Sequence, residues 1–121
     1  MRSRTIRAVA AVKDLFFVAR IRETARMVGT PLVFARTPQE LTAALAEPAG
    51  LVIVDLTARD LDYAAAFQAL EGVAPRPPVL GFTTHALARE TQPLHGRCTR
   101  VVTKETLTQE LPELLKTGVP A

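Results

Sequence analysis

The chain has 121 residues, of which 48% are hydrophobic and 22% charged, and its formal net charge is +3. This length allows one domain with one hydrophobic core, and the composition excludes disordered, fibrous and low-complexity classes. With no Trp and with arginines spread along the chain, the small basic excess gives no footprint typical of nucleic-acid binding. No apolar run approaches the roughly 20 residues that a membrane span needs.

The cysteine content and the N-terminus bear on location. Cys98 is the only cysteine, so no disulfide forms within the chain, which suits a reducing compartment. The apolar stretch 6–12 is too short, and Arg7 and Lys13 make it too charged, for a signal peptide. We therefore expect a cytoplasmic protein with a single domain over residues 1–121.

Strand-like and helical patterns alternate along the chain. The β-like apolar runs predict strands at residues 6–12, 32–35, 51–54, 79–82 and 100–103. Helical spacing, capping residues and breakers predict helices over 14–28, from Pro38 to Pro48, from Asp60 or Leu61 to Gly72, over 84–92 and from Thr106 to Gly118. Pro93 is expected to stop the fourth helix, and Pro112 to kink the fifth or delay its start.

Five strand–helix alternations predict an α/β, doubly wound fold with a five-stranded parallel sheet and helices on both faces. At this size we expect the flavodoxin-like strand order 2-1-3-4-5. Its switch point lies between the first and third strands, at the carboxyl edge where ligands bind in such folds. Asp14 and Asp55 both fall at that point.

Four polar residues follow the apolar runs of the predicted strands. They are Asp14, Asp55, Thr83 and Lys104, each close to the end of a different strand. Asp55 is the most informative, because a carboxylate that closes an all-apolar strand needs a partner or solvent. Thr84 is a second candidate for the hydroxyl, although Thr83 fits the spacing better.

With these four residues in this order, the chain resembles the receiver domain of bacterial two-component response regulators (CheY-like) over essentially its whole length. The resemblance implies that Asp55 is the phosphoacceptor. It implies a Mg²⁺ ion bound by Asp14, Asp55 and the backbone carbonyl of Thr57. It also implies that Lys104 neutralises a phosphoryl oxygen and that Thr83 moves to hydrogen-bond another.

Four departures from the family pattern favour a divergent member. Lys13 stands where the family has an acidic residue, which weakens the expected Mg²⁺ site and offers an ammonium to pair with Asp55. The loop 56–60 lacks the usual Met-Pro and later Gly. Val101 replaces the switch aromatic, and Glu105 replaces the proline after the lysine.

The favoured hypothesis is therefore a degenerate pseudo-receiver that acts through protein–protein contacts and is not an enzyme. The main alternative is a working, Mg²⁺-dependent receiver phosphorylated on Asp55. A further alternative is a small flavodoxin-like enzyme using Asp14, Asp55 and Lys104. A fourth is nucleic-acid binding by the arginines near the N-terminus, from Arg2 to Arg7, which the composition does not favour.

The site residues also have simpler interpretations. Asp14 is equally well explained as the N-cap of the first helix. We expect Lys104 to pair with Asp55.

Other polar residues are expected to have structural roles. We expect Asp60 and Asp62 to cap and charge the third helix. His85 and His95 are expected to be ordinary surface residues. Cys98 is expected to be a small filler at the start of the fifth strand.

Because the chain ends soon after its last predicted helix, we expect no attached output domain and an output made through a protein contact. The resemblance implies a partner such as a histidine kinase, a phosphotransfer protein or a downstream target, and a homodimer is a further option. The expected contact surface comprises Leu87, Arg89, Arg100, Val101 and Glu105. We expect no membrane association.

Overall fold

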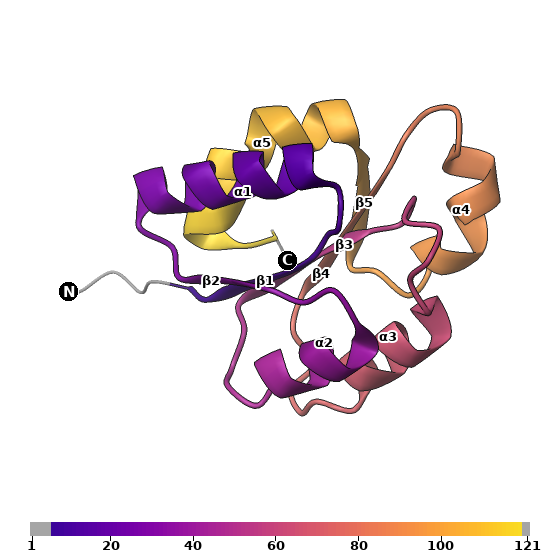
Figure 1. The fold of residues 1–121 in the computed structure, drawn as a ribbon, viewed down its shortest axis with the longest axis horizontal. Helices are drawn as coiled ribbons and strands as arrows, with labels where there is room; N and C mark the ends of the chain where they lie inside the picture. Colours follow the sequence, from indigo (N-terminus) through magenta and orange to yellow (C-terminus); the bar gives the residue numbers. More distant parts are fainter. Residues whose placement is uncertain (1–5, 120–121) are drawn as a thin grey trace.

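The computed structural model describes residues 6–119, which form a parallel sheet with helices on both faces (Figure 1). In chain order the elements are β1 (Ala8–Ala11), α1 (Leu15–Val28), β2 (Leu32–Phe34), α2 (Pro38–Ala44), β3 (Leu51–Asp55), α3 (Tyr63–Glu71), β4 (Val79–Thr83), α4 (Ala88–His95), β5 (Arg100–Thr103) and α5 (Lys104–Thr117). The strand order is β2-β1-β3-β4-β5 and every pairing is parallel, which confirms the predicted fold.

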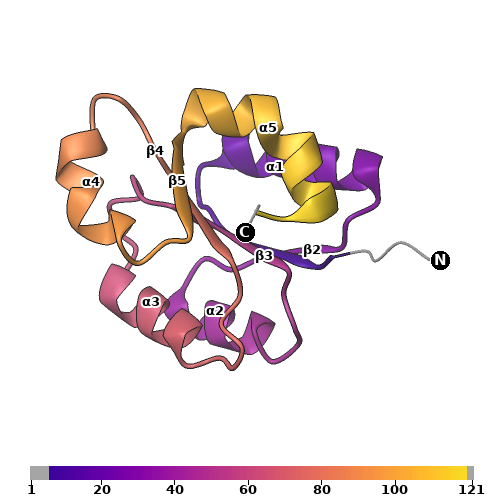
Figure 2. The same cartoon turned by 180° about the vertical axis from the view of Figure 1, so that it is seen from behind.

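Both faces of the sheet are buried, and alternate residues of each central strand enter different cores. Leu51 and Ile53 of β3 join the core beneath α1 and α5, whereas Val52 and Val54 join the core beneath α2 and α3. Figure 2 shows the same two layers from behind, with α4 beside α3 and near β4 and β5. A strand buried on both faces must be apolar at every position, which is why β3 was readable from the sequence.

Side-chain caps fix the starts of α1, α2 and α3. Asp14 caps α1, and Thr37 caps α2, with its Oγ1 accepting the Glu40 amide at 3.0 Å. The third helix begins at Tyr63, later than predicted, because Asp62 takes the capping position. Gly29 ends α1 with φ at 77°, a left-handed conformation that glycine adopts without strain.

The prediction that α4 spans residues 84–92 and stops at Pro93 was wrong. Thr84 instead forms a turn, in which its carbonyl and hydroxyl oxygens accept the Leu87 amide, so the helix starts later. It then continues through Pro93 to His95. The carbonyl that Pro93 leaves without an intrahelical donor belongs to exposed Arg89, where water can reach it.

The expected late start of α5 was also wrong. Thr103, not Thr106, is the N-cap, and its Oγ1 accepts the Thr106 amide at 3.2 Å. The helix therefore begins at Lys104 and includes Pro112. Its apolar stripe is buried against β4, β5 and α1, as predicted; it comprises Leu107, Leu111, Leu114 and Leu115.

Two expectations concern the chain ends and the membrane. Arg2 and Arg4, on which the nucleic-acid hypothesis depends, lie outside the described residues. Over residues 6–119, every helix is too short or too polar to span a bilayer.

Candidate functional site

The strand ends meet at one edge of the sheet, as the sequence predicted. The register pairs Asp55 of β3 with Phe82 of β4, and Thr83 with Thr103 of β5. Lys104 follows Thr103 directly as the first residue of α5. Asp55, Thr83 and Lys104 therefore lie at the ends of three adjacent strands, with Asp14 beyond the end of β1.

Asp55 is almost completely buried, with 3% of its surface exposed. Its Oδ1 accepts hydrogen bonds from the backbone amide of Thr57 at 2.8 Å and from the Thr57 hydroxyl at 2.6 Å. Oδ2 makes no hydrogen bond within residues 6–119. Because every fully buried side-chain oxygen in this range has a partner, Oδ2 is not fully buried and retains contact with solvent. One carboxylate oxygen thus supports the loop that follows β3, and the other makes no hydrogen bond among these residues.

Tyr63, the only tyrosine, fixes the same loop from the start of α3. Its hydroxyl lies 2.7 Å from the carbonyl oxygen of Asp55 and 2.8 Å from that of Ala58, and shares one proton between them. Burial, and then the negative charge of Asp55, raise the pKa of Tyr63, so the phenol stays a donor. Sequence reasoning missed Tyr63, because nothing in its spacing reveals where a side chain eight residues after Asp55 will point.

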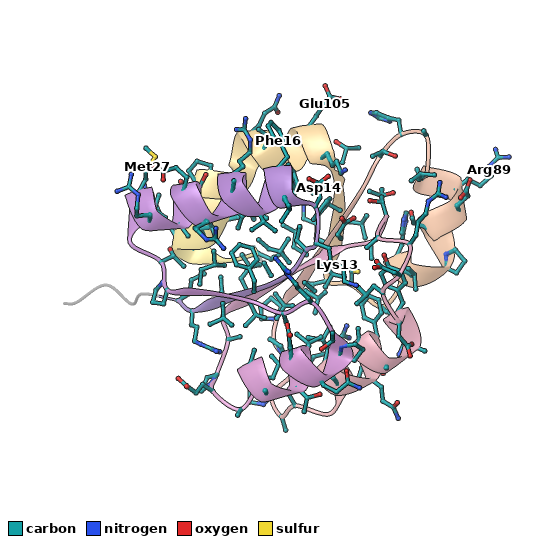
Figure 3. The ribbon with its side chains drawn as sticks, in the orientation of Figure 1. Lys13, Asp14, Phe16, Met27, Arg89 and Glu105 are labelled. Carbon is teal, nitrogen blue, oxygen red and sulfur yellow. The ribbon has the colours of Figure 1, made fainter. Side chains whose placement is uncertain are left out.

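Asp14 acts as a helix cap, the simpler of its two interpretations. The residue is exposed, and its Oδ1 accepts the amides of Phe16 at 2.9 Å and Phe17 at 3.2 Å. Figure 3 shows Asp14 at the start of α1. One of the two carboxylate oxygens of Asp14 is therefore already used by two backbone donors.

This assignment predicts the effect of replacing Asp14. Asp14→Ala is expected to lower the free energy of unfolding by about 1 kcal/mol, because it leaves two helix N-terminal amides without an acceptor. Asp14→Ser, which restores a capping oxygen without a charge, is expected to recover most of that loss in urea denaturation. If both variants match the wild type, Asp14 is not a stabilising cap.

Lys13 pairs with Asp60 and not with Asp55, contrary to expectation. The Lys13 Nζ lies 3.1 Å from Asp60 Oδ2. The hydrogen bond from Lys13 is the main cause that holds the pKa of Asp60 below its usual range. The sequence suggested that Asp60 caps α3, and this was wrong. Asp60 instead connects the loop after β3 to Lys13, which lies after the end of β1.

Lys104 was expected to pair with Asp55, but no such ion pair occurs among residues 6–119. The ammonium instead lies over the ring of Phe17, 5.7 Å from its centroid. Phe17 comes from α1, which packs beside α5, and its ring also contacts Phe82 at a centroid distance of 5.0 Å. The cation thus contacts an aromatic face in place of the expected carboxylate.

Thr83 is connected to α4. Thr83 is 3% exposed, and its hydroxyl oxygen lies 3.1 Å from the Oγ1 of Thr91, which is also buried. Thr91 Oγ1 lies 2.8 Å from His95 Nε2, so with the Nε2–H tautomer the histidine donates to Thr91 and Thr91 donates to Thr83. His95 is half-buried, which corrects its assignment as a surface residue, whereas His85 is exposed. The spacing of four residues between Thr91 and His95 was the available signal.

A groove of about 500 Å³ separates the loop after β3 from α4. Its lining includes Thr57, Arg59 and Tyr63 on one side and Glu90 and Thr91 on the other. Asp55 itself does not line the groove, although its neighbours Leu56 and Thr57 do.

The donors at the sheet edge fit Mg²⁺ poorly. Mg²⁺ needs several oxygen ligands in near-octahedral geometry. Within residues 6–119 no three His, Cys, Asp or Glu side chains gather as a metal site would require. Of the expected ligands, Asp14 caps α1 and Asp55 Oδ1 binds Thr57, while the Lys13 ammonium occupies the position after β1.

Cys98 lies just before β5 and is half-buried, in keeping with a filler role. Its sulfur faces Gly81 of β4, and a Cβ on that glycine would lie 2.8 Å away. Burial raises the pKa of the Cys98 thiol to about 11, so the reactive thiolate is scarce at neutral pH.

The expected contact surface is only partly available. Arg89 and Glu105 are exposed, and Figure 3 shows them projecting from α4 and α5. Val101 is partly exposed. Arg100 instead donates to both carboxylate oxygens of Glu110 at 2.8 and 3.3 Å, and so ties β5 to α5. Leu87 is partly buried and lines the groove beside α4.

No protein-family profile and no curated protein sequence matches the chain. Solved structures do match. The chemotaxis response regulator CheY4 of Vibrio cholerae aligns with a TM-score of 0.74 and 16% identity, over 93% of this chain and 97% of that one. The receiver domain of sensor histidine kinase PA1611 from Pseudomonas aeruginosa was determined with magnesium in its active site cleft. It aligns with a TM-score of 0.72 and 16% identity, over 93% of this chain and 95% of that one.

A third similar structure is described as a streptococcal redox sensor that evolved from two-component response regulators. It aligns with a TM-score of 0.72 and 13% identity, over 91% of this chain and 51% of that one. At these identities the likeness concerns the backbone and not the site. The chain therefore has the flavodoxin-like fold of response-regulator receiver domains.

Proposed function

We propose that this protein is a receiver-like signalling domain that has lost the Mg²⁺-dependent phosphorylation switch and acts through a constitutive protein–protein contact. The observation that carries the proposal is the Lys13–Asp60 ion pair at the sheet edge. It places a cation where a receiver needs a metal-binding carboxylate. The receiver fold supports a role in two-component signalling.

The electrostatics of the edge support a metal-free state. An ammonium repels a divalent cation, and Lys13 is additionally held in place by Asp60. The ion pair joins the loop after β3 to the segment after β1 without a metal. Asp55 then serves as an acceptor for Thr57, which is a structural role.

The contacts of Thr83 and Lys104 support a fixed state of the edge. For Thr83 to turn toward a group on Asp55, it would lose the hydrogen bond with Thr91 that connects β4 to α4. Lys104 would have to leave the face of Phe17. A domain held in this way presents one surface to its partner at all times.

The surface proposed for the partner is the exposed side of α4, β5 and α5, represented by Arg89, Val101 and Glu105. Arg100 is set aside, since its guanidinium is engaged by Glu110. The partner class that fits this fold is a protein of a two-component pathway, such as a histidine kinase, a phosphotransfer protein or a downstream target.

The second candidate is a working phosphoacceptor. It is favoured by Asp55 Oδ2, which lacks a recorded partner among residues 6–119 and contacts solvent, and by the magnesium bound in the Pseudomonas aeruginosa receiver domain. Lys104 lies at the same edge and would reach a phosphoryl group on Asp55 only after leaving Phe17.

Mg²⁺ affinity separates the two candidates. We expect no saturable Mg²⁺ binding by the wild type in the millimolar range, and binding by Lys13→Asp at least tenfold tighter. At roughly 10 Å in bulk water, two units of charge interact with a divalent cation by about 1.7 kcal/mol, which corresponds to about a 16-fold change in Mg²⁺ affinity. Lys13→Ala removes the cation without adding a ligand, and is expected to raise the Mg²⁺ affinity about fourfold over the wild type.

Titration of backbone amide shifts with MgCl₂ measures this, with an equal ionic strength of NaCl as the control for screening. Tight binding by the wild type would contradict the proposal. Equal affinities of all three proteins would show that Lys13 does not control the site.

A further inference from the structure

The outer side of α1 exposes large apolar side chains that nothing in the chain covers within residues 6–119. Phe16 is 76% exposed and Met27 is 71% exposed. Figure 3 shows both projecting from α1, one near each end of the helix. Single exposed apolar residues are ordinary, but two large ones at opposite ends of one helical face suggest a contact surface.

These residues belong to one continuous face of α1, which borders a shallow groove of about 430 Å³. The face, here called the α1 outer face, comprises Phe16, Ala19, Arg20, Glu23, Thr24 and Met27. Their separations of three and four positions place them along one side of the helix. The opposite side, with Phe17, Ile21 and Ala25, is buried in the core.

From either end of this face, the residue types follow the same order: a large apolar residue, a small residue and a charged residue. If two copies of α1 pack antiparallel about a two-fold axis between positions 21 and 22, the pairs are fixed by symmetry. Phe16 then faces Met27 of the second copy, and Arg20 faces Glu23. Ala19 faces Thr24, two small side chains at the positions between the charged and apolar pairs.

We propose that the α1 outer face binds a second copy of this chain as an antiparallel, two-fold symmetric helix pair. Symmetry makes every pair occur twice, so the interface contains two apolar pairs and two Arg20–Glu23 pairs. A parallel arrangement would put Arg20 against Arg20 and Glu23 against Glu23, which like-charge repulsion disfavours. The proposal is independent of the proposed function, since none of the α1 outer-face residues belongs to the surface proposed for the partner, which is represented by Arg89, Val101 and Glu105.

The contact is expected to be weak. A 14-residue helix is about 21 Å long, and one helix pair of this length falls in the small class of interfaces, below about 1,200 Å². We therefore expect a reversible dimer with a dissociation constant in the micromolar range. Such a dimer would dissociate at nanomolar concentrations, where the chain would be a monomer.

Glu23 also accepts hydrogen bonds from Arg26 of its own helix, so reversal of its charge affects α1 itself as well as the contact. Charge reversal is therefore tested with both variants, alone and mixed, because only the contact between copies predicts recovery in the mixture. Arg20→Glu makes two carboxylates face each other across the axis, and Glu23→Arg makes two guanidinium groups do so. Each variant alone is therefore expected to lose at least tenfold in self-association. In a mixed dimer, Arg20→Glu of one copy faces Glu23→Arg of the other, so this pair again joins opposite charges with their order reversed. The second pair is formed by the unchanged Glu23 and Arg20 and is the same as in the wild type. Sedimentation velocity is expected to show a heterodimer in the mixture and monomers in the separate samples.

Glu47→Arg is the matched control, because Glu47 is exposed after α2, on the other face of the sheet, and the charge change is the same. It is expected to associate like the wild type. A wild type that stays monomeric at high micromolar concentration would overturn the proposal and leave the face to a different protein. A dimer that resists both single reversals would also overturn it, because the contact would then lie elsewhere.

Discussion

Replacing Phe17 with alanine is expected to lower the free energy of unfolding by about 3–5 kcal/mol, whereas replacing its neighbour Phe16 changes it by less than about 0.5 kcal/mol. The two residues have the same side chain and lie in the same turn of α1. Phe17 is 7% exposed and packs against Phe82, while Phe16 is 76% exposed. The difference therefore measures the burial of the Phe17 ring together with its contacts to Phe82 and Lys104.

Removal of the Phe17 ring also frees the Lys104 ammonium, whose only recorded aromatic contact within residues 6–119 is that ring. Urea denaturation at low micromolar protein measures both stabilities with the α1 contact largely dissociated. Phe16→Ala is expected, in addition, to weaken self-association at high concentration. Similar losses of stability in the two variants would contradict the assignment of α1 faces.

Adding a methyl group at Gly81 is expected to destabilise the fold by about 1–3 kcal/mol, as overpacking of a dense core does. Gly81 lies in β4, where a Cβ would come 2.8 Å from the Cys98 sulfur and 2.9 Å from Cδ1 of Leu56. The leucine end can rotate away, but the sulfur is held between β4 and α4. Cys98→Ala should therefore recover at least half of the loss when combined with Gly81→Ala.

Gly96→Ala is the control for this pair, because no atom lies within 4 Å of a Cβ at that position and its backbone needs no positive φ. It is expected to be nearly neutral. Thermal or urea denaturation of the single and double variants forms a double-mutant cycle. If the Gly81 and Cys98 effects are simply additive, the two side chains do not compete for the same space.

The fold could be predicted because its information is local. Buried parallel strands are continuous apolar runs, so β3 and β4 were each found with one residue of error, and Gly29 and Thr37 marked helix ends correctly. The errors at α4 and α5 arose where a capping threonine and a proline gave conflicting signals. Local hydrogen bonds of Thr84 and Thr103 set the two helix starts, and both helices continue through their prolines.

The candidate site could be predicted only in part. Strand ends fix backbone positions, so Asp55, Thr83 and Lys104 were correctly expected at one edge. Their partners depend on long side chains and on loops that return from elsewhere. Lys104 lies over a ring from α1, and Lys13 meets Asp60 from the loop after β3, and no periodicity encodes either contact.

The most direct test of the central claim is a titration with Mg²⁺ and beryllofluoride, followed by backbone amide NMR. Beryllofluoride stands in for a phosphoryl group on a carboxylate, so it reports whether Asp55 can complete the metal-dependent switch. We expect no saturable shifts in the wild type at millimolar Mg²⁺, and shifts in Lys13→Asp. Saturable wild-type shifts centred on Asp55, Thr83 and Lys104 would contradict the loss of the switch and identify a working phosphoacceptor.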